Sequence, residues 1–379
     1  MFGRKLKVAT LLGFAVYIDL SWLFLAALIT WSLASSVFPV DYPGLALSTY
    51  WIMGAIGALG LFVSILSHEL AHSVVARRFG IPIRGITLFI FGGVAEMEDE
   101  PPSAKSEFLM AAAGPLWSVV LAGLFYLAAS LGSGAPPAVH GTLSYLALMN
   151  ALLAGFNILP AFPLDGGRVF RAGLWHLRKD FVSATRFAAR VGSWFGLGFM
   201  ILGAAAFLFT GGQAFGGIWW VVIGLFLRGA AQSELARLTA TAVLGGRTVG
   251  EIMTRDPVAV PAALSVARLV DEFVYRYFHD SFPVLDDGKL VGIVGVRQLE
   301  SIPSVNWPIT AIRDVMRPAD ADLLVDPGAP ALKVLMQMQK AQTSRLLVAK
   351  AGRLVGIVTA RDLIQAIELA GRIGKIRDG

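Results

Sequence analysis

The chain has 379 residues, of which 56% are hydrophobic and 15% are charged, and its formal net charge is +6. Soluble globular proteins carry about 25% charged residues, so this composition excludes an ordinary soluble protein over the whole length. Cysteine is absent, which excludes disulfides and thiolate metal sites. The apolar runs are confined to residues 1–232, whereas residues 247–379 read as a soluble α/β sequence.

The chain starts with a basic segment, Met1 to Lys7, that leads into an apolar stretch reaching about residue 35. This stretch is too long for a cleaved signal peptide, so we interpret it as a retained membrane helix. A membrane-spanning helix needs roughly 20 mostly apolar residues. Six segments satisfy this requirement, at about 10–35, 51–76, 106–132, 141–161, 189–210 and 215–232.

The loops between these segments differ in their basic residues. Loops 36–50, 133–140 and 211–214 contain no Lys or Arg. The opposite loops contain Arg77, Arg78, Arg84, Lys105, Arg168, Arg171, Arg178, Lys179 and Arg186. A basic excess marks the cytoplasmic side, so both termini are predicted to be cytoplasmic. Because the basic residues lie next to membrane helices, the net charge gives no reason to expect nucleic-acid binding.

The second span contains Ser67-His68-Glu69-Leu70-Ala71-His72, which has the pattern H-E-x-x-H. Residues four apart share a helix face, so His68 and His72 can turn a ring nitrogen toward one metal ion. In hydrolases with this pattern the two histidines bind Zn²⁺ and the glutamate, here Glu69, is the general base. The alternative is a polar helix end at the membrane surface. The apolar run before the motif favours a metal site, because ionisable groups inside a membrane are costly.

A third ligand is expected at a similar depth, because catalytic zinc normally has three protein ligands and one open position. Asp165 follows the fourth span, where Pro160 and Pro163 break the helix and Gly166-Gly167 permits a tight turn. Irregular backbone at membrane depth occurs where it is buried in protein or lines a cavity. Asp165 is therefore the candidate third ligand, with helix capping as the alternative.

These two motifs together resemble the site-2 protease family of intramembrane zinc metalloproteases. The second motif reads Asn157-x-x-Pro160-x-x-Pro163-Leu164-Asp165-Gly166-Gly167, and Gly114-Pro115 and Phe91-Gly92-Gly93-Val94-Ala95 also fit that family. The resemblance covers roughly residues 10–235. It implies one zinc ion per chain, with His68, His72 and Asp165 as ligands and Glu69 as catalytic base. It also implies that Asn157 lies near the substrate backbone or the developing oxyanion.

The segment from Ile86 to Met97 is rich in β-forming residues and punctuated by glycines, which predicts a hairpin. A substrate helix must unwind before it is cut, because its carbonyls are engaged in helical hydrogen bonds. We hypothesise that the edge of this hairpin pairs with the unwound substrate. A purely structural hairpin is the alternative.

Residues 247–371 contain an internal repeat. Glu251-Ile252-Met253 matches Asp314-Val315-Met316, and Leu290 to Val294 matches Leu354 to Val358. This resembles a tandem pair of CBS (cystathionine-β-synthase-type) domains, which implies clefts for ATP, ADP or AMP. The ribose-binding pattern of that family is present at Thr359 and Asp362, whereas the first repeat has Gly295 and Gln298 instead. The sequence therefore predicts at most one nucleotide site, and a homodimerisation module without ligand is the alternative.

The predicted fold class is an α-helical polytopic membrane protein with six transmembrane helices and a zinc site in the membrane, followed by a cytoplasmic α/β CBS-pair domain. The predicted boundaries are a metalloprotease domain at 1–232, a linker at 233–246, CBS repeats at 247–305 and 306–371, and a tail at 372–379.

The predicted function is that of an intramembrane zinc endopeptidase in the cytoplasmic membrane of a prokaryote. It would cut the transmembrane segment of a single-pass membrane protein and be regulated by adenine nucleotides at the CBS pair. Two alternatives stay open, a CBS-regulated membrane metal transporter and a non-catalytic membrane scaffold. The transporter leaves Glu69 without a role.

Overall fold

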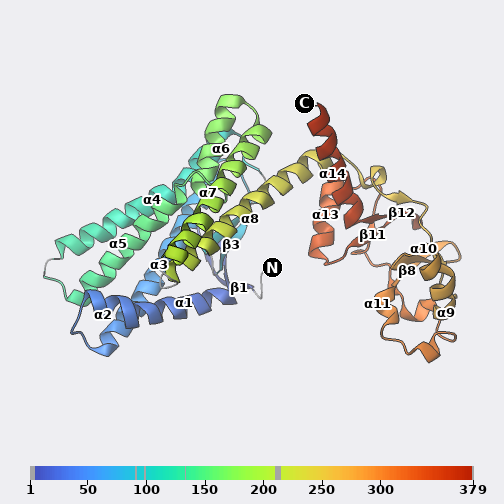
Figure 1. Cartoon of the computed structure of the whole chain (residues 1–379), viewed down its shortest axis with the longest axis horizontal. Coiled ribbons are helices and arrows are strands. Elements are labelled where there is room, and N and C mark those ends of the chain that lie inside the picture. The colour runs from blue at the N-terminus through green and yellow to red at the C-terminus, as the bar shows by residue number, and fades with distance from the viewer. Residues whose placement is uncertain (1–4, 90–91, 98–99, 133, 210–214, 378–379) are drawn as a thin grey trace. The chain divides into compact units, whose positions relative to one another are not determined.

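The computed structural model describes residues 5–89, 92–97, 100–132, 134–209 and 215–377 (Figure 1). The chain divides into two compact units, Met1–Leu235 and Ala236–Gly379, which we call the helical unit and the α/β unit. The predicted loop 211–214, and Ile90 and Phe91 of the predicted hairpin, lie outside the described residues.

The helical unit begins with two strands where a membrane helix is predicted. β1 (Lys5–Leu11) and β2 (Phe14–Asp19) pair as an antiparallel hairpin, and α1 begins only at Leu20. The predicted start of the first span near residue 10 is therefore wrong. Gly13 turns the chain with a φ of 88°, and the alternate residues Phe14 and Val16 are buried. This period of two is a strand pattern that the surrounding apolar run conceals.

Two strands from the start of the helical unit and two that follow α3 (Leu47–Arg78) form one four-stranded sheet, with the strand order β1-β2-β3-β4. β3 (Ile83–Phe89) runs parallel to β2 and antiparallel to β4 (Gly92–Met97), with Thr87 opposite Val94. The hairpin predicted over residues 86–97 is thus confirmed in its described part. β4 is an edge strand of this sheet, so one side of its backbone faces no strand of the sheet.

The rest of the helical unit consists of helices joined by short connections (Figure 1). Their bounds are α1 Leu20–Ser32, a π-helical segment Leu33–Val37, α2 Phe38–Asp41, α3 Leu47–Arg78, α4 Ala104–Leu131, α5 Pro137–Asn157, α6 Asp165–Arg178, α7 Phe181–Phe209 and α8 Phe215–Leu244. The long helices leave large apolar side chains such as Phe24, Leu116 and Trp194 exposed. Apolar surface of this extent is typical of helices that face lipid.

Within the described residues, five helical stretches are long and apolar enough to cross a membrane. They are Leu20–Asp41, Leu47–Arg78, Ala104–Leu131, Pro137–Asn157 and Phe181–Phe209. The chain is thus a multi-pass membrane protein by helix composition. The sixth predicted span, 215–232, falls inside α8, which does not meet the same criterion. The number six therefore stays a prediction.

The α/β unit is built from two similar halves that exchange strands. The first sheet has the order β6-β7-β8-β9 and the second has the order β10-β11-β12-β5. β5 (Thr254–Arg255) belongs to the first half in sequence but pairs with β12 (Arg353–Thr359) of the second half. β9 (Arg317–Pro318) makes the reciprocal exchange with β8 (Lys289–Gly295). This reciprocity confirms the internal repeat.

The other elements of the α/β unit follow in chain order. They are a 3-10 turn Val249–Glu251, β6 Val260–Pro261, α9 Val266–Leu269, a π-helical segment Val270–Val274, α10 Tyr275–Tyr277, β7 Ser281–Asp286, α11 Val296–Leu299, a 3-10 turn Ser304–Asn306, α12 Ile312–Val315, β10 Leu324–Val325, α13 Ala331–Lys340, β11 Arg345–Lys350 and α14 Ala360–Arg377.

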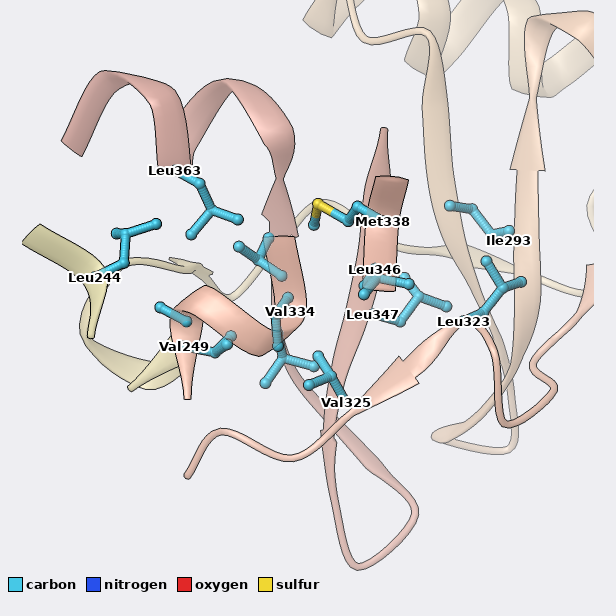
Figure 2. Packing of buried hydrophobic residues seen from close by; sticks show 13 residues of the cluster. Leu244, Val249, Ile293, Leu323, Val325, Val334, Met338, Leu346, Leu347 and Leu363 are labelled. Carbon is cyan, nitrogen blue, oxygen red and sulfur yellow. The ribbon is translucent and has the colours of Figure 1, made fainter. Parts of the chain in front are cut away.

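One hydrophobic core of this unit joins the end of α8 to the second half (Figure 2). Leu244, the last residue of α8, is fully buried beside residues such as Val249, Val334 and Leu363. α8 extends through residue 244, so most of the predicted linker 233–246 is helical.

Candidate metal centre

The two histidines of the H-E-x-x-H pattern lie on one face of α3 with their rings directed at each other. His68 and His72 are separated by one helical turn, and their Nε2 atoms are 3.1 Å apart. His68 is buried at 3% exposure. Two imidazole nitrogens at this separation can share one ion, as the i, i+4 spacing predicts.

Asp165 reaches the same point from a distant part of the chain. Its Oδ2 lies 3.1 Å from Nε2 of His68 and 3.1 Å from Nε2 of His72. It is the first residue of α6, whose start packs tightly on the preceding loop. A Cβ at Gly166 would lie 2.1 Å from the Ile158 carbonyl oxygen, so glycine is required for this approach. Within the described residues, His68, His72 and Asp165 are a group whose ligand atoms could hold a metal ion.

The other ring nitrogens of both histidines are held by α4. Nδ1 of His72 is 2.7 Å from the carbonyl oxygen of Met110, and Nδ1 of His68 is 2.9 Å from Oγ of Ser118. A carbonyl oxygen only accepts, so Nδ1 of His72 must carry the hydrogen. Nε2 of His72 then keeps its lone pair for a metal, as expected for a metal-binding histidine.

The backbone of α4 lies against these two rings at Gly114, which has no side chain. A Cβ built on Gly114 would lie 2.2 Å from Nε2 of His72 and 2.6 Å from Nε2 of His68. Met110, Gly114 and Ser118 follow at intervals of four, so one stripe of α4 forms the wall of the site. Two imidazoles and a carboxylate with such a wall fit a zinc ion, which prefers three protein ligands and one open position in hydrolases.

Glu69, the predicted base, lies between the two histidines in sequence and against β4 in space. A Cβ at Gly93 would lie 2.5 Å from Cγ of Glu69, so only glycine permits this approach of the edge strand. The edge of the hairpin is thus brought next to the side chain predicted to move protons.

Asn157 is the last residue of α5, and its Nδ2 donates to the carbonyl oxygen of Leu153 at 3.0 Å. This bond keeps the amide on its own helix. The structure therefore joins His68, His72 and Asp165 by direct contacts, but gives no such contact between Asn157 and the three.

Several residues of the site could not be identified from the sequence. Ser118 belongs to no sequence motif, and a backbone carbonyl such as that of Met110 is present at every residue. The one sequence signal for Ser118 is that a serine stands in an apolar helix, four residues after Gly114. The sequence pattern places Arg171 in a basic loop at the membrane surface, but this residue is 2% exposed and lies in α6.

The predicted nucleotide residues lie at the junction of β12 and α14. Oδ2 of Asp362 accepts hydrogen bonds from Thr359 N at 2.9 Å and from Thr359 Oγ1 at 2.8 Å. The first repeat forms a similar turn, in which Gly295 N donates to Gln298 Oε1 at 3.0 Å. Both turns therefore cap the helix that follows them.

A cavity of about 440 Å³ lies in the α/β unit, between segments of the two repeats. Its lining includes Arg297 and Arg317, together with the ion pair that Arg345 makes with Asp280 at 2.5 Å and 2.7 Å. The guanidinium of Arg345 holds the pKa of Asp280 below its usual value. Thr359 and Asp362 are not among the lining residues. The cavity lies instead at the turn of the first repeat, where Gly295 and Gln298 line it.

Comparison with known proteins gives the same division of the chain. The model of peptidase family M50 matches residues 56–138 and 132–203, and the CBS domain model matches residues 249–301 and 312–369. Rip3 of Mycobacterium tuberculosis, which is named as a zinc metalloprotease, is 37% identical over 361 residues. That alignment covers 94% of this chain and 91% of Rip3.

Three further proteins are similar to this chain over part or most of its length. Zinc metalloprotease MJ0392 of Methanocaldococcus jannaschii is 29% identical over 342 residues, covering 90% of this chain and 94% of that protein. Among solved structures, the site-2 protease from Methanocaldococcus jannaschii is 26% identical, with a TM-score of 0.42, and covers 61% of this chain and 95% of its own. The structure of CBSX2 in complex with AMP is 25% identical, with a TM-score of 0.29, and covers 33% of this chain and 99% of its own.

Proposed function

Since this chain belongs to peptidase family M50, the site-2 protease family, we propose that His68, His72 and Asp165 hold its zinc ion and that the enzyme cuts transmembrane segments. The chain is a site-2-protease-like zinc metalloendopeptidase with tandem CBS domains. This membership favours the protease over the metal transporter and the scaffold. The observation that carries the proposal is the convergence of Nε2 of His68, Nε2 of His72 and Oδ2 of Asp165, each 3.1 Å from the others.

Glu69 is the proposed general base. When bound, zinc supplies a water molecule of lowered pKa and polarises the scissile carbonyl. Glu69 would take a proton from that water and deliver it to the leaving amine, a role that contributes about 10²–10⁴-fold to the rate. Asn157 would turn its Nδ2 from the Leu153 carbonyl to the developing oxyanion.

The substrate is proposed to be a single-pass membrane protein. The long apolar helices support this, because a site among them admits a segment that is itself in the bilayer. Such a segment is helical and must unwind before its carbonyls are accessible. The free edge of β4 offers backbone groups for the unwound strand, and Gly93 brings that edge next to Glu69.

We place the enzyme in the cytoplasmic membrane of a prokaryote with both termini inside. The absence of Lys and Arg from loops 36–50 and 133–140 supports this orientation. In this orientation the α/β unit is cytoplasmic, where adenine nucleotides are present, and it could also join two chains as a dimer.

A proteomic comparison tests the proposed reaction even while the substrate is unidentified. Cells that produce the wild type or Glu69→Gln are compared by mass spectrometry of protein N-termini. The proposal expects new termini inside predicted transmembrane segments in wild-type cells alone. New termini confined to soluble segments would reject intramembrane cleavage and leave a soluble-segment protease.

Nucleotide regulation is proposed on the CBS pair, with ATP, ADP or AMP held near Thr359 and Asp362. Titration calorimetry of ATP and of AMP into the protein measures binding directly. Loss of binding in Asp362→Ala would support this site. Binding that survives in Asp362→Ala but is lost in Arg297→Ala would instead place the ligand in the 440 Å³ cavity.

A further inference from the structure

A buried ionic cluster joins four helices of the helical unit. Its centre is Arg171 of α6, which is 2% exposed. Nε of Arg171 donates to Oε1 of Glu107 in α4 at 2.7 Å, and Nη2 donates to the same oxygen. Nη1 donates to Oε1 of Glu234 in α8 at 3.1 Å and lies 3.5 Å from Oγ1 of Thr185 in α7. Glu107 is completely buried, so this pairing is made away from water.

Aromatic rings further restrict the guanidinium of Arg171. Its central carbon lies 5.0 Å from the ring centre of Phe162 and 4.8 Å from that of Phe181. Arginine suits such a position, because it remains charged and its planar group combines stacking with directed hydrogen bonds. A side chain held from so many directions fixes the helix that carries it.

That helix is α6, which begins at Asp165. Arg171 lies six residues further along, roughly 9 Å at the rise of an α-helix. Glu107 lies in the first turn of α4, the helix that supplies the Met110 carbonyl, Gly114 and Ser118 to the metal site. The Glu107–Arg171 pair therefore ties the helix of the third ligand to the helix that orients both histidines.

Glu234 adds a second connection, to α8. Its side chain is 24% exposed, and α8 continues ten residues beyond it. At the end of α8, Leu244 is buried in the core of the α/β unit (Figure 2). One helix thus carries both a residue bonded to Arg171 and a residue of the core formed by the second CBS repeat.

We propose that Arg171 is the positioning residue for Asp165, and that its bond to Glu234 makes the placement of Asp165 depend on α8. The inference rests on the proposed function, because Asp165 is taken as a zinc ligand. It assigns to the Glu107–Arg171–Glu234 cluster the role of holding α6 against α4 and α8. Outer contacts of this kind typically change metal affinity or activity by about 10–100-fold.

The test uses the full-length protein with a variant that removes the two most deeply buried charges together. In the double variant Glu107→Gln, Arg171→Met, both deeply buried charges are removed and the volumes are nearly kept, which is tolerated better than loss of one partner. Glu234→Gln removes only the link to α8. Glu300→Gln, which removes an exposed acid, is the matched control. The zinc dissociation constant is measured by chelator competition, and the d–d absorption of the Co²⁺-substituted protein reports the ligand geometry.

The double variant is expected to weaken zinc binding about 10–100-fold and to change the cobalt spectrum while thermal unfolding stays cooperative. Glu234→Gln is expected to change the cobalt spectrum with a smaller loss of affinity, and Glu300→Gln to match the wild type. A double variant with wild-type affinity and spectrum would overturn the positioning role. A wild-type spectrum in Glu234→Gln would overturn the link to α8. If Asp165→Ala does not weaken zinc binding, the proposed ligand set fails instead.

Discussion

Gly114 is the residue on which the approach of α4 to the two histidines depends most directly. A methyl group there would lie 2.2 Å from Nε2 of His72, inside any allowed contact. The neighbouring groups are ring atoms held at Nδ1 by Met110 and Ser118, so they have little freedom to move away. The metal site therefore needs the space left by the glycine at position 114 as well as its three ligands.

Gly114→Ala is predicted to abolish stoichiometric zinc binding, because the new methyl group occupies the space between α4 and the histidines. Gly123→Ala is the matched control, since it lies in the same helix with no atom within 4 Å of its Cβ. Elemental analysis of the purified variants measures zinc per chain. Full zinc in Gly114→Ala would show that α4 does not approach the rings as described.

The ligand residues could be predicted because their chemistry is local in sequence. His68 and His72 follow from a spacing of four, and Asp165 follows from a helix break at matching depth. Ser118 and Arg171 could not be predicted, because their meaning comes from contacts with segments about 50 and 64 residues away. A charged residue near a membrane helix reads as a surface residue until its partner, here Glu107, is known.

At the scale of elements, the close approach of β4 to α3 couples the hairpin to the proposed base. Gly93→Ala is predicted to reduce cleavage by about 10²-fold or more while zinc stays bound, because the methyl group would displace Glu69 and not the ligands. Gly155→Ala, with open space around its Cβ, serves as control. Peptide cleavage and zinc content are measured on the same preparations. Unchanged cleavage in Gly93→Ala would contradict the coupling of β4 to Glu69 in the reaction.

Between the two CBS repeats, the ion pair of Asp280 with Arg345 gives a pH-dependent contribution to stability. The pKa of Asp280 is lowered in the folded chain by the hydrogen bond from Arg345. The contribution is therefore present above about pH 4, the usual Asp value in an unfolded chain, and is lost as the pH falls through the lower folded value. Asp280 is 73% exposed, so screening limits the gain to about 0.5 kcal/mol.

Asp280→Asn is accordingly predicted to lower the free energy of unfolding of residues 236–379 by about 0.5 kcal/mol at pH 7 and by less at pH 2. Urea unfolding followed by the fluorescence of Trp307, the one tryptophan in this segment, gives both values. Asp271→Asn, at an exposed position of the same unit, is the control. An equal loss at both pH values would mean that the effect is not ionic.

Elements are predictable where their periodicity is long and uninterrupted. Three helices, α3, α4 and α5, coincide with predicted spans to within a few residues at both ends. α7 ends where predicted but begins eight residues before its predicted start at 189. β1 and β2 escape prediction because each strand is short and lies beside an apolar helix. α6 falls where the sequence predicts a loop, since its amphipathic sequence carries the basic residues that mark a membrane surface.

At the scale of the whole molecule, the chain combines a metalloprotease unit with a CBS pair, and α8 belongs to both. The internal repeat at a spacing of about 63 residues is visible in the sequence, whereas the strand exchange between the halves required the structure. Matches to the M50 and CBS models fall on separate parts of the chain, which agrees with a division near residue 235.

The central claim, that His68, His72 and Asp165 form a zinc site served by Glu69, is tested most directly by counting zinc in the detergent-purified protein. The account predicts about one zinc per chain in the wild type, loss in His72→Ala, weakened binding in Asp165→Ala, and full zinc without cleavage in Glu69→Gln. Zinc absent from a folded wild type, or unaffected by His72→Ala, would contradict it.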